Sequence, residues 1–98
     1  MLLFVEFDIN ADIINVPQSV IDDRENLSRR FLKWLYDKNT KHKYWYTFPG
    51  GEKGVIFRSD AFVDFLNKHV LMDSAQKATI LQQEVPLEEK KDLPSVFF

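Results

Sequence analysis

One six-residue segment combines side chains that are suited to binding. Lys43–Phe48 reads Lys-Tyr-Trp-Tyr-Thr-Phe and has the aromatic and β-branched content of a strand. Its alternating side chains fall on two faces, with Lys43, Trp45 and Thr47 on one and Tyr44, Tyr46 and Phe48 on the other. Exposed aromatic rings beside cations are how RNA-binding sheets stack bases. The segment therefore predicts a surface for either a nucleic acid or another protein.

This strand lies in the basic, aromatic centre of the chain. Residues 24–58 carry nine Lys or Arg and three acids, a local charge of +6, and hold eight of the fourteen aromatics. Residues 1–23 carry five acids and no base. Such a patch is the electrostatic footprint of nucleic-acid binders. The residues expected to contact phosphates are Arg29, Arg30, Lys33, Lys41 and Lys43.

A simpler interpretation of the same centre has more weight than a nucleic-acid-binding surface. The aromatics would fill a core and a hairpin surface, and the charges would form the solvated side of a helix. The net charge of −2 and the isoelectric point near 5.6 also argue against a nucleic-acid binder. No RNP-type aromatic motif is visible.

The end of the chain is a second candidate for a contact surface. Residues 87–98 begin with a charged run and finish in Val-Phe-Phe, and we expect them to form an extended tail. Two terminal phenylalanines can fold back onto a sheet, enter a groove of a partner, or add a strand to an open sheet edge. The hypothesis is that Phe97 and Phe98 contact a protein partner.

No catalytic pattern stands out among the ionisable residues. The chain has no cysteine, which excludes disulfides, thiolate zinc sites and cysteine nucleophiles. His42 and His69 have no second ligand at metal spacing. Glu6 and Asp8 share a strand face and are the pair to test for metal binding or acid–base catalysis. The loop 49–54 lacks the spacing of a phosphate-binding loop. We expect no cofactor, no metal and, on balance, no enzymatic activity.

The elements that position these residues follow from periodicity and turn chemistry. We expect a strand over Leu2–Asp8 and a connection over Asn10–Gln18. A helix should follow that is capped by Ser19 or Asp22 and buries Leu27, Phe31, Trp34 and Leu35. After it we expect a hairpin of Lys43–Phe48 and Val55–Arg58, and then a helix capped by Ser59. Residues 77–85 fit a strand or a short capped helix, and their β-branched content favours the strand.

The expected fold is a small α+β domain over residues 1–86, followed by the tail. With residues 77–85 as a strand, the order β-α-β-β-α-β matches a ferredoxin-like arrangement, two helices on one face of an antiparallel sheet. The N-terminus lacks the features of a signal peptide, and no stretch approaches the ~20 apolar residues of a membrane span. A cytoplasmic protein without membrane contact is therefore expected.

The leading functional hypothesis is a non-enzymatic protein-interaction module, a small regulatory, adaptor or inhibitor-like protein. Its partner would be another protein or a second copy of the chain. The alternative is nucleic-acid binding through residues 24–58. The residues expected to contact the partner are Arg29, Arg30, Lys33, Lys43, Tyr44, Trp45, Tyr46, Phe97 and Phe98.

Overall fold

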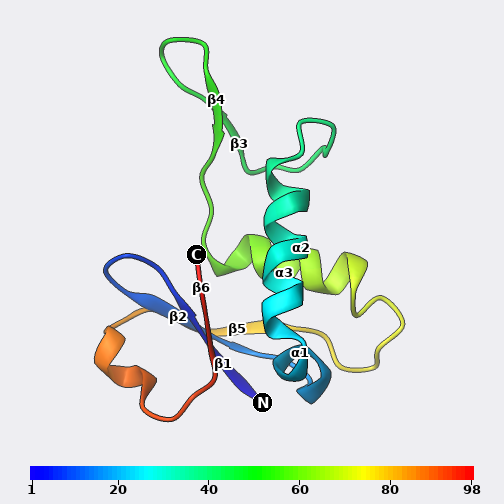
Figure 1. Cartoon of the computed structure of the whole chain (residues 1–98), viewed down its shortest axis with the longest axis vertical. Coiled ribbons are helices and arrows are strands. Elements are labelled where there is room, and N and C mark those ends of the chain that lie inside the picture. The colour runs from blue at the N-terminus through cyan, green and yellow to red at the C-terminus, as the bar shows by residue number, and fades with distance from the viewer.

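A four-stranded sheet organises the chain in the computed structural model, which describes all residues from 1 to 98 (Figure 1). Its strands are β1 Leu2–Glu6, β2 Ala11–Asn15, β5 Thr79–Val85 and β6 Ser95–Phe97, in the order β5-β2-β1-β6. β2 runs antiparallel to both β1 and β5, whereas β6 runs parallel to β1. The fold class is α+β, as the sequence predicts.

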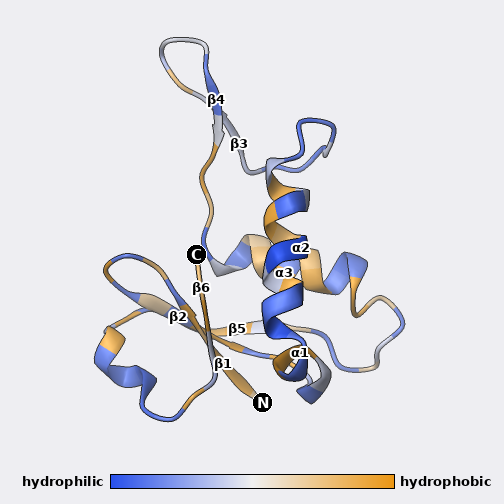
Figure 2. Cartoon of the chain, viewed as in Figure 1, coloured by the Kyte–Doolittle hydropathy of each residue, from blue (hydrophilic) through white to orange (hydrophobic).

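The helices pack on this sheet through apolar stripes. They are α1 Gln18–Asp22, α2 Arg24–Tyr36 and α3 Ser59–His69, whereas the short 3₁₀ turn η1 Leu87–Lys90 buries no residue. α2 buries Leu27, Phe31 and Leu35, which recur every four residues and so lie on one side of a helix. Figure 2 shows hydrophobic residues concentrated on the main sheet and on α3, while β3, β4 and the loop that follows α2 are more hydrophilic.

The aromatic side chain of Phe31 lies at the centre of the core. The rings within 5.1–6.2 Å of it, measured between centroids, are Trp34, Phe57, Phe62, Phe65 and Phe98. Most of these pairs meet edge to face, an arrangement that adds roughly 0.5–1.5 kcal/mol per pair to simple burial. Several aromatics of the basic centre, residues 24–58, therefore pack in the core, as its simpler interpretation predicts.

The expected hairpin forms, although its return strand is Lys53–Val55 and not Val55–Arg58, and it does not join the main sheet. β3 Trp45–Thr47 and β4 Lys53–Val55 make a separate two-stranded sheet that projects from the body (Figure 1). The order of elements therefore differs from β-α-β-β-α-β. In the main sheet β1 pairs with β2 and β6, and the strands of the middle hairpin pair only with each other.

Strand β2 lies where the sequence predicts a connection, and that prediction is wrong. Of the turn-forming residues in Asn10–Gln18, Asn10 and Pro17 flank the strand, whereas Asp12 and Asn15 lie within it. Ala11 and Ile14 are fully buried, and all five residues of β2 pair with β1. Burial and cross-strand pairing outweigh the local turn signal. The strand prediction for residues 77–85 is confirmed by β5.

The C-terminal segment is part of the fold, which corrects the expectation of an extended tail over residues 87–98. β6 pairs with β1, and the Phe98 N–H donates a hydrogen bond to the Glu6 carbonyl over 2.9 Å. The ring of Phe98 lies 5.1 Å from Phe31 and 5.2 Å from Phe62. Phe97, the preceding residue and the last of β6, points the other way and is 65% exposed.

Asp12 is the one fully buried carboxylate, and it ties three segments together. Its oxygens accept hydrogen bonds from Arg58 Nη2 at 2.7 Å and from Ser59 Oγ at 2.6 Å. The Glu84 N–H donates a third bond at 3.0 Å. Glu84 has a φ of 56°, and the β2–β5 register shifts beside Asp12, so a bulge turns this N–H toward the carboxylate. Ser59 thus binds Asp12 instead of capping its own helix.

The hydrogen bonds around Asp12 keep its side chain ionised. Burial by itself would raise the pKa of Asp12, but the bonds from Arg58, Ser59 and Glu84 together outweigh it and hold the pKa below its usual value. A carboxyl with a lowered folded-state pKa stabilises the protein above its unfolded-state pKa, about 3.9. That stability is lost as the pH falls through the folded-state pKa.

Replacing Asp12 should destabilise the fold and remove part of its acid sensitivity. We expect Asp12→Asn to cost about 3 kcal/mol at neutral pH, because it leaves Arg58 without its charged partner. The urea midpoint of the variant should also fall less than that of the wild type between neutral pH and about pH 3. Asp8→Asn, at an exposed position, is the matched control and should change neither quantity. Equal midpoints for the two variants would contradict the role of Asp12.

The two terminal phenylalanines should differ sharply in their effect on stability. We expect Phe98→Ala to cost about 3 kcal/mol, because it removes a ring packed among core aromatics. Phe97→Ala should change the free energy of unfolding by less than about 0.5 kcal/mol, since that side chain is largely in water. Urea unfolding followed by circular dichroism measures both. Similar losses for the two variants would argue against the docked C-terminus.

Candidate functional site

The projecting hairpin is fixed to the body through Tyr44. The Tyr44 hydroxyl donates a 2.6 Å hydrogen bond to Asp64 Oδ2 on α3, and the side chain is only 6% exposed. Burial, the bond to Asp64 and the negative charges of Asp60 and Asp64 raise the pKa of Tyr44 far above its usual value. The structure thus places Tyr44, one of the expected partner contacts, in the core as an anchor.

Trp45 is held in one orientation by two contacts. Its Nε1 donates a hydrogen bond to the Thr40 carbonyl over 2.9 Å. Its indole stacks on the His42 ring, with centroids 5.1 Å apart and planes 8° from parallel. His42 is itself fixed, because its Nε2 lies 2.8 Å from the Leu35 carbonyl and its Nδ1 accepts the Tyr44 N–H at 3.1 Å. The indole is therefore a preorganised surface on the hairpin.

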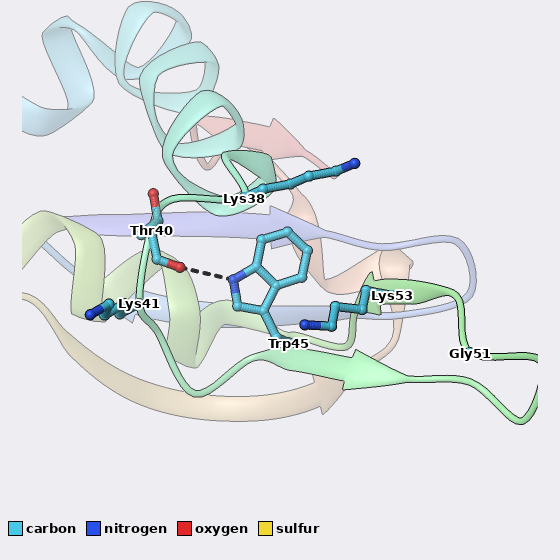
Figure 3. A pocket seen from close by; sticks show the side chains of 6 residues that line it. All are labelled: Lys38, Thr40, Lys41, Trp45, Gly51 and Lys53. Atoms are coloured by element: carbon cyan, nitrogen blue, oxygen red, sulfur yellow. Dashed lines mark hydrogen bonds between the residues drawn. The ribbon is translucent and has the colours of Figure 1, made fainter.

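Lysines from two segments surround this indole. A groove of about 510 Å³ separates the loop after α2 from the hairpin (Figure 3). Its lining residues are Lys38, Thr40, Lys41, Trp45, Gly51 and Lys53. The structure contains two ion pairs, Arg58–Asp12 and Lys90–Glu6, so none of the three lysines is paired. The groove is a positively charged depression around one aromatic ring, and we call it the lysine groove.

The other face of the hairpin is apolar. Tyr46 and Phe48 meet edge to face with centroids 5.0 Å apart and are 46% and 41% exposed. Gly54 is the cross-strand partner of Tyr46, and a Cβ there would lie 2.6 Å from the Phe48 ring. The missing side chain lets Phe48 lie across the strand beside Tyr46. Ile56, 60% exposed, continues toward the body. We call Tyr46, Phe48 and Ile56 the apolar face.

The basic residues expected on α2 lie apart from the groove. Arg29, Arg30 and Lys33 are exposed on the helix, and none of them lines the lysine groove. Arg29 lines a separate shallow depression together with Phe97. The Arg30 guanidinium carbon lies 5.9 Å from the centre of the Phe65 ring. The basic centre of the sequence is thus divided over at least two surfaces.

Two groove lysines, Lys38 and Lys53, were not singled out from the sequence. Lys53 is the cross-strand partner of Thr47, so pairing the two halves of the hairpin would have placed it on the Trp45 face. Lys38 gave no comparable signal, because its position depends on how the loop after α2 returns to the hairpin. Lys43, an expected contact, is exposed with its Nζ 5.6 Å from the Tyr44 ring centre.

The candidate catalytic residues do not converge. Glu6 lies 3.7 Å from Lys90, Asp8 is exposed, and no group of three or more His, Cys, Asp or Glu side chains lies together as a metal site would need. His69 packs on Trp34 and Phe65, with ring centroids 5.7 and 5.6 Å away. The geometry of a binding surface is therefore better developed in this chain than that of a reaction centre.

Comparisons of this chain with protein-family models, with curated proteins and with solved structures find no match. None of the helices is both long enough and apolar enough to cross a membrane. The two faces of the hairpin are the most developed binding surfaces of the chain.

Removing the hydroxyl of Tyr44 should weaken the anchor of the hairpin. We expect Tyr44→Phe to cost about 1 kcal/mol through the lost bond to Asp64. A raised folded-state pKa gives stability below the unfolded-state pKa, about 10, and loses it as the pH rises through the folded-state value. The variant should therefore lose less stability than the wild type above about pH 10. Tyr46→Phe, on the exposed face, is the control and should lose as much stability at alkaline pH as the wild type. If Tyr44→Phe also lost as much stability as the wild type above about pH 10, this role of Tyr44 would be contradicted.

Proposed function

We propose that the protein is a non-enzymatic interaction module that docks on another protein through the apolar face of its hairpin. The observation that carries the proposal is the exposed Tyr46–Phe48 pair on an arm that projects from the body (Figure 1). These rings keep about half of their surface in water, although the same chain buries other aromatics completely. Tyrosine is enriched among the residues that dominate protein interfaces.

The shape and anchoring of the arm support this use. An aromatic pair contributes most to binding when it is held in place before the partner arrives, because little conformational entropy is then lost. The Tyr44–Asp64 bond fixes the arm at its base, and Gly54 lets the Phe48 ring lie across the strand, edge to face with Tyr46. The lysines on the arm would steer it toward an acidic partner without adding much to the final affinity.

The C-terminus contributes less to this proposal than the sequence predicts. Phe98 is committed to the core, so only Phe97 remains available to a partner. Phe97 lies on the edge strand β6, beside the depression that Arg29 lines. A second copy of the chain is the partner that this smaller surface would suit, through an added strand at the sheet edge.

Polar replacements on the apolar face should abolish docking and leave the fold intact. The test is affinity capture with the full chain, followed by calorimetry of each captured protein against purified variants. Tyr46→Ser combined with Phe48→Ser should weaken the affinity at least about 30-fold, the loss typical of a hot spot of 2 kcal/mol. Ile9→Ser removes an apolar side chain that is 83% exposed elsewhere and should leave the affinity unchanged.

Two outcomes would contradict the proposal. One is a partner that binds the double variant as tightly as the wild type. The other is a capture profile that is equally reduced by the Ile9 control, which would show general apolar adhesion. Light scattering of the wild type and of Phe97→Ser separates self-association through β6 from docking through the hairpin.

A further inference from the structure

We propose that the lysine groove is a nucleotide-binding site, in which a base stacks on Trp45 and its phosphates lie against Lys38, Lys41 and Lys53. The ligand is a unit of single-stranded nucleic acid. Trp45 and Tyr46 are neighbours in β3 and point to opposite faces of the hairpin. The site therefore does not depend on docking through the apolar face.

Trp45 provides the stacking surface. His42 covers one face of the indole, and a ligand in the groove would meet the other. The bond from Nε1 to Thr40 and the stack on His42 fix the plane of the ring before any ligand arrives. Stacking of a base on such a ring is sequence-tolerant and is worth about 1–3 kcal/mol per base.

The lysines provide the phosphate contacts. Figure 3 shows Lys38 and Lys53 on opposite sides of the indole, with Lys41 on the loop beyond Thr40. All three amines lack a carboxylate partner in the fold. A bound polyanion would supply the negative charge that these lysines do not find within the fold.

The composition of the groove favours a nucleotide over an acidic peptide. Trp45 is its single hydrophobic lining residue, and the other five are polar, charged or glycine. A peptide anchor needs an apolar pocket, whereas a nucleotide needs one ring and several cations. The volume of about 510 Å³ lies within the ~300–1,000 Å³ range of small-ligand sites and suits one or two nucleotide units.

The acidic character of the whole chain does not oppose this site. The acidic turn η1 and the β1–β2 hairpin lie at the end of the molecule away from the arm (Figure 1). At physiological salt, charges further apart than about 8 Å are largely screened. The carboxylates next in sequence to the groove residues are Asp37 and Glu52, fewer than the three lysines, so a strand that reaches the groove would meet a net positive charge.

The test is fluorescence anisotropy of a labelled oligo(dT) titrated with the full chain at several salt concentrations. Three phosphate contacts predict that log K falls against log salt with a slope of about −2. Lys53→Glu should weaken binding at least about tenfold. Lys68→Glu makes the same charge change at an exposed position of α3 outside the groove and should change it less than about twofold.

The stacking contact has its own readout. In a Trp34→Phe background, Trp45 is the only tryptophan, so its emission should be quenched on binding. Trp45→Ala should lose about tenfold in affinity, and Trp45→Phe should keep most of it. Circular dichroism of each variant shows whether the fold is retained, and Lys53→Glu decides the test if the alanine variant does not fold.

The choice of competitor identifies the ligand. Displacement of the oligonucleotide by unlabelled single strand, but only weakly by ATP, is the expected result. If ATP bound as tightly as the single strand, the ligand would be a free nucleotide and the proposal of a single strand would be overturned. Equal binding of poly-glutamate, unquenched Trp45 emission, or equal effects of the Lys53 and Lys68 variants would each overturn the site.

Discussion

The buried carboxylate of Asp12 is the constraint on which the rest of the structure depends. A charge with no exposed surface is tolerated only where its hydrogen bonds are satisfied, and Asp12 obtains them from two segments distant in sequence. Ser59 and Arg58 begin helix α3, and Glu84 belongs to the bulge of β5. The register of β5, the start of α3 and the middle of β2 are therefore fixed by a single side chain.

The same interaction determines where the hairpin can project. Arg58 follows the return strand of the hairpin by three residues, and its guanidinium carbon also lies 4.5 Å from the centre of the Phe7 ring. Tyr44, just before the outgoing strand, is bonded to Asp64 one turn further along α3. Both ends of the hairpin are thus attached to the first half of one helix. An arm attached at two points presents its faces in a constant direction.

The two faces of this arm have different chemistry because a strand alternates its side chains. Tyr46 and Phe48 share a face with Gly54, and because Gly54 has no side chain, the Phe48 ring can lie against its backbone. Trp45 and Lys53 share the other face, which the loop after α2 completes with two further lysines. The arm is therefore apolar on one side and cationic on the other.

The amino-acid sequence by itself determined the α+β class, the stripe of α2, the hairpin and the strand over 77–85, because these depend on local periodicity and turn chemistry. It also placed Trp45 and Tyr46 on opposite faces. Only the tertiary structure decided that residues 11–15 form a strand, that Phe98 enters the core, and that Lys38 and Lys53 meet at Trp45. Those outcomes depend on burial and pairing between segments distant in sequence, and no local pattern encodes a contact such as Asp12 with Arg58, 46 residues apart.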